Sequence, residues 1–429
     1  MRRARGSAPL LADRGRRAAI LLPTLLLLVG LGAGGAAGWR SVTGRGQRAR
    51  PPASPPLLVK AVEGPIVELR DLGEIAYTDQ RGTVAAVSTD GRARRVLGSA
   101  GSLRGAPAAQ PAGGRVTVSA DGSFADGYLD DGSPVAVRLA DGQVRRLSPP
   151  ATMAATATAR SADGAVVAVC AGRRRGETDA PAADHPATSI LGRDGRQLAS
   201  FPGCLLDLAR DGSAALVPEP AGGAEAGGLP GPVRGVRLWL RSGGQRPVLA
   251  HAAAVEAARL VDPAAEPALV VVDGAWLAPD ARHALVRVGQ QRDAAVTERP
   301  RSGAWGPGSA LVLVDLPTGR WRLVPSETSG TGSVAWAPTG GFAYALPPDS
   351  WDPSGGSLLV TYVPPAGPPT LVQVGDRSDS RLAFSPDGDW LLLPGGGRWV
   401  FIRVDDPAVR MSYAAPGEFA GWLPRRAAR

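Results

Sequence analysis

The chain has 429 residues, of which 44% are hydrophobic, and a formal net charge of +9. This length suits one large closed repeat fold or two to three ordinary domains. The first fifty residues hold ten of the 48 basic residues and one of the 39 acidic ones, which leaves 38 of each in the remainder. Nucleic-acid affinity rests on contacts between basic side chains and phosphates, so a remainder without net charge argues against a nucleic-acid partner.

An uncharged apolar segment occupies residues 18–39, with arginines on both sides. As a helix it is long enough to cross a hydrocarbon core of about 30 Å. We therefore predict an uncleaved transmembrane signal-anchor. The second half of the segment is rich in glycine and alanine, so a cleaved signal peptide is an alternative. A buried core helix is a third reading, which the lack of an amphipathic face disfavours.

The arginines around this segment predict its orientation. Six precede it and four follow closely, and an excess of basic residues marks the cytoplasmic side of a membrane. We expect a basic cytoplasmic N-terminus (1–17), the anchor (18–39), a Pro/Arg-rich linker (40–56), an extracytoplasmic folded domain (57–424) and a basic tail (425–429). The predicted localisation is a single-pass protein of the cell membrane.

A short turn phrase recurs along the folded domain and is fullest at Ser385-Pro386-Asp387-Gly388. Each copy lies between two short apolar runs, and Pro, Asp and Gly are the residues that tight turns favour. Corresponding turn residues of successive copies, such as Asp121 and Asp163 or Asp211 and Asp280, lie 42 to 69 residues apart, which indicates a tandem array of small sheets. The five weaker copies are Ala120-Asp121-Gly122, Ala162-Asp163-Gly164, Arg210-Asp211-Gly212, Ala278-Pro279-Asp280 and Ala337-Pro338-Thr339-Gly340.

A second set of hairpin turns alternates with the first, and two hairpins form one four-stranded propeller blade. These seven turns lie near residues 89–91, 140–143, 193–195, 241–243, 317–319, 364–369 and 405–407. There are seven turns of the second kind but only six of the first, so the first blade has no turn of the first kind and no innermost strand ahead of it. Residues 419–424 have the sequence pattern of such a strand. We predict an all-β fold, a seven-bladed β-propeller that this C-terminal strand closes.

With its Ser-Pro-Asp-Gly turns ahead of apolar strands, the chain resembles the TolB-like and WD-repeat-like β-propellers over residues 57–424. The resemblance is good in the last two blades and weak in the others. The Gly-His pair of true WD repeats is missing. The resemblance implies a propeller fold and no particular chemistry.

Four long segments between the second and third strands of a blade are expected to project from one face of the ring. They are residues 171–187, 218–234, 289–309 and 347–357. Such insertions often build a binding surface, although Gly/Pro-rich segments also expand neutrally. Trp305 and Trp351 stand in them outside the strand pattern and are the predicted partner contacts. Alternatively, each covers the rim of its own blade.

The two cysteines, Cys170 and Cys204, fall at neighbouring positions across a predicted blade boundary. Outside the cell they could form a disulfide, and two unpaired core cysteines are the alternative.

No set of residues with catalytic spacing is found in the sequence. A Gly-x-Ser-x-Gly elbow is absent, and the three histidines, His185, His251 and His283, are widely separated. We predict no metal, no cofactor and no enzyme activity. The first hypothesis is a membrane-anchored scaffold that binds an envelope protein or a wall component. The alternative is a propeller enzyme or sensor that acts on glycans or small ligands at the central channel. The oligomeric state stays open.

Overall fold

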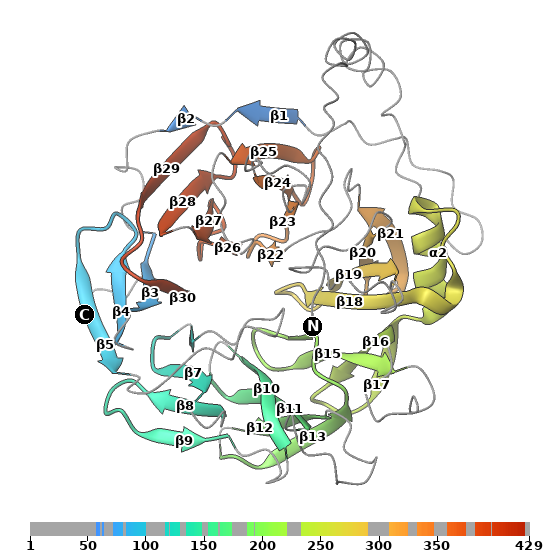
Figure 1. Cartoon of the computed structure of the whole chain (residues 1–429), viewed down its shortest axis with the longest axis horizontal. Coiled ribbons are helices and arrows are strands. Elements are labelled where there is room, and N and C mark those ends of the chain that lie inside the picture. Colours follow the sequence, from blue (N-terminus) through green and yellow to red (C-terminus); the bar gives the residue numbers. More distant parts are fainter. Residues whose placement is uncertain are drawn as a thin grey trace, which may run out of the picture. The chain divides into compact units, whose positions relative to one another are not determined.

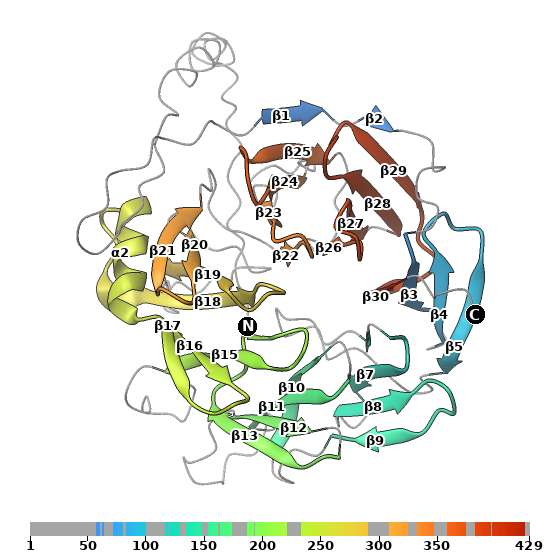
Figure 2. The ribbon, with the colours of Figure 1, turned by 180° about the vertical axis from the view of Figure 1, so that it is seen from behind.

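Seven sheets follow one another around a ring in the computed structural model of the chain (Figure 1), and Figure 2 shows the same ring from behind. The seven-bladed all-β propeller predicted from the turns is confirmed. The structure describes residues 57–60, 62–63, 72–79, 83–99, 116–119, 121–128, 134–147, 153–161, 164–173, 187–192, 194–220, 233–290, 309–324, 333–346, 358–374, 382–395 and 397–424.

Each of the first four blades has four antiparallel strands, in order from the innermost outward. Blade one contains β30 (Glu418–Leu423), β3 (Glu74–Thr78), β4 (Thr83–Ser88) and β5 (Arg94–Ser99). Blade two contains β6 (Thr117–Val118), β7 (Phe124–Tyr128), β8 (Pro134–Arg138) and β9 (Val144–Arg146). Blade three contains β10 (Met153–Arg160), β11 (Val166–Arg173), β12 (Ala187–Gly192) and β13 (Gln197–Pro202). Blade four contains β14 (Asp207–Leu208), β15 (Ala214–Pro220), β16 (Val233–Leu240) and β17 (Gln245–Leu249).

Blade five also has four strands, and the last two blades carry a fifth strand on the outside. Blade five contains β18 (Val270–Leu277), β19 (His283–Gln290), β20 (Ala310–Asp315) and β21 (Arg320–Val324). Blade six contains β22 (Val334–Trp336), β23 (Phe342–Leu346), β24 (Leu358–Val363), β25 (Thr370–Val374) and, outermost, β1 (Leu57–Lys60). Blade seven contains β26 (Ala383–Phe384), β27 (Trp390–Gly395), β28 (Arg398–Arg403), β29 (Val409–Ala414) and, outermost, β2 (Val62–Glu63).

The C-terminal strand closes the ring as predicted. β30 pairs antiparallel with β3, so that Glu418 lies opposite Thr78 and Leu423 opposite Glu74. The indole Nε1 of Trp422 also donates a hydrogen bond of 3.2 Å to the carbonyl of Leu72. Closure pairs the inner edge of blade one, which would otherwise be an exposed sheet edge.

Two features were not expected from the sequence. β1 and β2 pair in parallel with β25 and β29, so the segment that enters the domain covers the outer edges of blades six and seven. Helix α2 (His251–Val261) and the 3₁₀ turn η2 (Pro267–Leu269) connect blade four to blade five. The buried face of α2 consists of Ala254, Ala257 and Ala258. This spacing gives no distinct helical signal, because alanine is common throughout the chain.

Neighbouring blades meet along seams that are mostly apolar. At three seams a residue on the second strand of one blade shares an apolar cluster with the last residue of the innermost strand of the next blade. These pairs are Ala168 and Leu208, Leu216 and Leu277, and Leu285 and Trp336. Burial of such side chains at about 25 cal/mol per Å² is the main force that holds blades together.

Candidate anion-binding cleft

The seam between blades two and three departs from this apolar pattern. When the turn phrases are aligned, the residue before each turn is apolar at Val118, Leu208, Leu277, Trp336 and Phe384, but it is Arg160 in blade three. The residue that would face it from blade two is Asp126, where blades three to seven have Ala168, Leu216, Leu285, Tyr344 and Leu392. A charged pair therefore occupies the place of an apolar contact.

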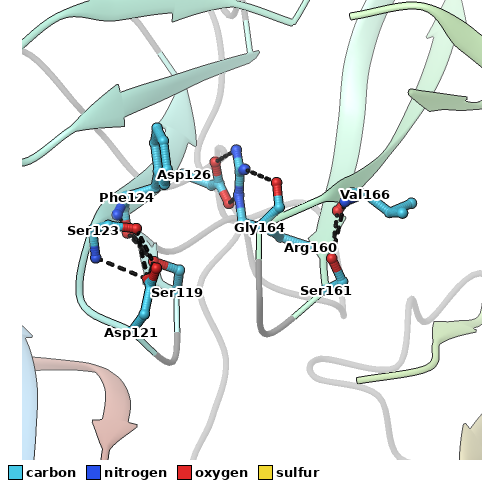
Figure 3. A network of polar contacts seen from close by, with 9 residues as sticks. All are labelled: Ser119, Asp121, Ser123, Phe124, Asp126, Arg160, Ser161, Gly164 and Val166. Carbon is cyan, nitrogen blue, oxygen red and sulfur yellow. Dashed lines mark hydrogen bonds and ion pairs between the residues drawn. The ribbon is translucent and has the colours of Figure 1, made fainter. Parts of the chain in front are cut away.

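Asp126 and Arg160 form a bidentate ion pair across the seam (Figure 3). Arg160 donates from Nε to Oδ2 at 2.5 Å and from Nη2 to Oδ1 at 2.6 Å. Their side chains are 3% and 8% exposed, respectively. Nη1 of Arg160 also donates to the carbonyl of Gly164 at 3.4 Å, and its guanidinium carbon lies 5.1 Å from the ring centroid of Phe124. The arginine is thus fixed by four separate contacts.

Burial sets the electrostatics of this pair. It raises the pKa of Asp126 above the ordinary value of an aspartate, and the hydrogen bonds and positive charge of Arg160 oppose that rise. The ionised form of Asp126 is therefore stabilised by Arg160. Removing the arginine would leave a buried acid with no basic partner.

The adjoining turns position both members of the pair. In blade two, Ser119 Oγ donates to Asp121 Oδ1 at 2.6 Å and accepts from the backbone N–H of Phe124 at 2.9 Å. In blade three, Ser161 Oγ accepts from the N–H of Val166 at 2.9 Å. These bonds fix the start of the second strand in each blade, as Figure 3 shows. Asp121 Oδ1 also accepts a hydrogen bond from the backbone N–H of Ser123 at 3.0 Å, so this turn aspartate caps the backbone, in line with the sequence interpretation.

A cavity of about 350 Å³ lies over this seam, and we call it the arginine cleft. It is lined by Phe124, Ala136, Arg138, Gln143, Arg145, Arg146, Leu147, Arg160, Gly164, Val167, Leu191, Gly192 and Gly195. Four of these residues are arginines and none is acidic. The cleft adjoins the hairpin turns, at the strand ends opposite to those that the predicted insertions connect.

Apolar side chains form the floor of the cleft. Ala136 and Leu147 of blade two pack with Val167 and Leu191 of blade three in one small cluster. The first three of these are each 4% exposed. The cleft therefore combines a hydrocarbon floor with a cationic rim, which is the composition of a site for a small amphipathic anion.

The arginines of the rim are held in place by their neighbours. Arg138 donates from Nε to Asp141 Oδ1 at 2.9 Å, and from Nη2 to Asp141 Oδ2 at 2.7 Å and to Gln143 Oε1 at 2.5 Å. Among the described residues, no partner is found for the N–H groups of its Nη1. Arg145 crosses the seam in the opposite direction to Arg160, and its guanidinium lies against Gly195. Planar guanidinium groups fixed in this way match carboxylates and phosphates.

The residues predicted from the sequence lie elsewhere. The structure joins Cys170, in β11, to Cys204, just before β14, by a disulfide with a Cα–Cα distance of 5.1 Å. Trp305 and Trp351 lie outside the described residues, as does most of each of the four predicted insertions. β11 extends through Arg173, so the first insertion is shorter than expected. The predicted anchor at residues 18–39 is also outside the described part of the chain.

The described residues contain no group of three or more His, Cys, Asp or Glu that could hold a metal ion. His251 begins α2, and Nδ1 of His283 lies 3.6 Å from Oδ2 of Asp280 at the start of β19. His185 is not among the described residues. No helix within the described ranges is long and apolar enough to span a membrane.

Sequence reasoning missed the arginine cleft, although a signal for the buried ion pair beneath it was present. Aligning the turn copies places Arg160 and Asp126 in two columns that are apolar in other blades. Two opposite charges in apolar columns of adjacent repeats predict a buried pair. The alignment does not reveal the cavity, because that depends on how the outer strands of two blades meet.

No protein-family model matches the sequence, and no curated protein matches it. Solved structures with a similar fold include a putative TolB from Agrobacterium tumefaciens, with 15% identity, a TM-score of 0.40, and coverage of 74% of this chain and 95% of that chain. The β-propeller domain of Cps50 (Swd1) from Myceliophteria thermophila has 13% identity, a TM-score of 0.45, and coverage of 73% and 90%. An oligogalacturonate lyase from Vibrio parahaemolyticus has 9% identity, a TM-score of 0.46, and coverage of 80% and 91%.

At such low identities these likenesses concern the fold alone. They include an enzyme as well as a TolB protein, so they do not decide whether this chain is an enzyme. The resemblance to TolB-like and WD-repeat-like propellers is confirmed at the level of the fold.

Proposed function

We propose that this protein is a non-catalytic interaction scaffold of the cell envelope, which a segment at residues 18–39 anchors in the membrane and which displays its propeller outside the cytoplasm. The arginine cleft is the observation that carries this proposal. It gathers four arginine side chains over one seam of a folded domain whose overall charge is balanced, and two of them are held by ion pairs with Asp126 and Asp141. Guanidinium groups that are already oriented suit an anionic group of a protein partner and make its recognition specific. We expect the partner to present an anionic group there.

Two further observations support the proposal. The disulfide between Cys170 and Cys204 is of a kind that persists in oxidising compartments outside the cytoplasm. The closed ring is a rigid support, so a partner finds the cleft already formed. Trp305 and Trp351 remain proposed as additional partner contacts.

Site-specific crosslinking in intact cells tests the scaffold. A photoreactive amino acid is introduced at Val144, which is 51% exposed on β9 beside the cleft, and as a control at Leu260, which is 37% exposed on α2. We expect a discrete protein adduct from position 144 alone, and its loss when Arg138→Ala is added. Equal adducts from both positions, or none from either, would reject the scaffold.

The placement outside the cytoplasm has a separate test. Protease added to intact cells should remove a C-terminal tag, while a tag placed before residue 18 should survive. Protection of the C-terminal tag would contradict the proposed orientation.

A sensor of small ligands is the second candidate, and the size of the cleft favours it. A volume of about 350 Å³ lies at the lower end of the range for small-molecule sites, roughly 300–1,000 Å³. A sensor would bind a free small anion at the cleft and yield no protein adduct from position 144.

A further inference from the structure

The arginine cleft has features that narrow the chemistry of its occupant. Its apolar floor of Ala136, Leu147, Val167 and Leu191 lies next to the arginine rim. A ligand that is only charged, such as inorganic phosphate, would make no favourable hydrophobic contact with this floor. A purely apolar ligand would desolvate the guanidinium groups without pairing them, which is costly.

The size of the cleft limits the occupant further. At about 350 Å³ it accommodates a group of the size of one amino-acid residue rather than a folded element. The anion and the hydrocarbon of the ligand must therefore lie close together. In a protein, the C-terminal residue places a free carboxylate and an apolar side chain on the same carbon atom, whereas Asp and Glu carry no such hydrocarbon branch.

The rim provides suitable donors for a carboxylate. Asp141 and Gln143 occupy Nε and Nη2 of Arg138 and fix the plane of its guanidinium, while the described residues offer Nη1 no acceptor. Arg160 is fixed in a similar manner by Asp126 and Gly164. Donors that are already oriented lose little entropy when a ligand binds.

We infer that the arginine cleft recognises the C-terminal residue of the partner protein, with its α-carboxylate at Arg138 and its branched apolar side chain on the floor. This inference rests on the proposed scaffold function, since it specifies the part of the partner that enters the cleft. Capture of a C-terminal carboxylate is an established mode of peptide recognition, in which oriented N–H groups hold the carboxylate.

Titration calorimetry of the full-length chain with single-residue probes tests the inference. N-acetyl-leucine mimics an apolar C-terminal residue, N-acetyl-leucinamide lacks its charge, N-acetylglycine lacks its side chain, and inorganic phosphate supplies an anion alone. We expect N-acetyl-leucine to bind at least roughly tenfold more tightly than each of the others. The amide cannot accept the charged hydrogen bonds of the guanidinium, and N-acetylglycine and phosphate lack the apolar side chain that covers the floor.

A pair of arginine variants identifies the site. Arg138→Ala should weaken N-acetyl-leucine binding by roughly tenfold or more. Arg246→Ala removes an exposed arginine from β17 in blade four and should leave the affinity unchanged. Equal binding of the acid and the amide, equal or tighter binding of phosphate, or an Arg138→Ala variant with unchanged affinity would overturn the inference.

The crosslinking experiment separates this inference from the scaffold proposal. An adduct from position 144 together with probes that show no preference for the carboxylate would retain the scaffold and reject the C-terminal residue as its ligand. Selective binding of N-acetyl-leucine without any adduct would reject both the scaffold and the partner terminus, and would favour a sensor of free small carboxylates.

Discussion

Two seams of the same ring hold their blades together by different interactions. The polar seam, between blades two and three, is centred on the ion pair of Asp126 and Arg160. The apolar seam, between blades four and five, has Leu216 and Leu277 at the corresponding positions, 0% and 6% exposed. The propeller fold therefore needs side chains that fill the space between the blades at these two positions, and apolar side chains fill it as well as charged ones. Because a buried ion pair seldom stabilises more than an apolar pair of similar volume, the polar seam is best explained by the site above it.

Breaking the ion pair should have the largest effect. Arg160→Leu removes the guanidinium and leaves the carboxylate of Asp126 buried without a basic partner. We expect the free energy of unfolding to fall by about 3–5 kcal/mol. Urea denaturation at pH 7 measures this loss against the wild-type protein.

The double variant Asp126→Leu/Arg160→Leu converts the polar seam into an apolar one. Replacing a whole buried ion pair with hydrophobic residues is often neutral or stabilising, so its stability should return to within about 1 kcal/mol of wild type or exceed it. If the double variant is as unstable as Arg160→Leu, the two seams are not equivalent and the comparison fails.

The apolar seam should respond to a loss of volume. Leu277→Ala leaves a cavity between blades four and five, for which we expect a loss of about 3 kcal/mol. Leu277→Met conserves most of the volume and should cost less than about 1.5 kcal/mol. Urea denaturation again provides the measurement, and equal losses for both variants would show that packing does not dominate at this seam.

A second buried aspartate sharpens the contrast between the seams. Asp207 of β14 accepts hydrogen bonds from the backbone N–H groups of Leu277, at 2.7 Å, and Leu208, at 2.9 Å. The residue is partly exposed, whereas its carboxyl end is enclosed. Burial raises the pKa of Asp207 to about 6 because these hydrogen bonds offset the desolvation only in part. The carboxylate of Asp126 is stabilised by the guanidinium of Arg160, whereas that of Asp207 accepts hydrogen bonds, within the described residues, from main-chain N–H groups alone.

This difference predicts a pH dependence. Since the native pKa of Asp207 lies above the unfolded value, its contribution to stability is full below about pH 4 and is lost as the pH rises through about 6. Asp207→Asn keeps an oxygen acceptor for Leu277 and does not titrate. Relative to wild type, the variant should gain about 2 kcal/mol between pH 4 and pH 7, as measured by urea denaturation across that range. Parallel curves for the two proteins would contradict the prediction.

The sequence allowed the architecture to be predicted because each turn carries its own local signal. Residues such as Pro386 and Gly388 specify a tight turn wherever they occur, and the surplus pattern at Phe419–Pro424 indicated how the ring closes. The strands β1 and β2 were not predicted, because pairing with β25 and β29 depends on edges that are distant in the sequence. The arginine cleft likewise forms only where two blades meet, so no local pattern specifies it.

The smallest expected effect on stability concerns Gly195, and it tests the cleft with little disturbance of the seam. Gly195 has a φ of +82° in the turn between β12 and β13, and a Cβ added there would meet the guanidinium of Arg145. Gly91 has a φ of +74° in the equivalent turn of blade one, and no atom lies within 4 Å of an added Cβ. Gly195→Ala and Gly91→Ala should therefore each lose about 1 kcal/mol through backbone strain alone.

Only Gly195→Ala should change the cleft, because Arg145 must move away from the turn while keeping its charge. We expect this variant to bind N-acetyl-leucine several-fold more weakly than Gly91→Ala does, as measured by titration calorimetry. Equal affinities would show that the position of Arg145 is immaterial and that Arg138 and Arg160 suffice to hold the carboxylate. In that case the ligand would be bound by Arg138 of blade two and Arg160 of the polar seam, and the outer turn of blade three at Gly195 would make no contribution to binding.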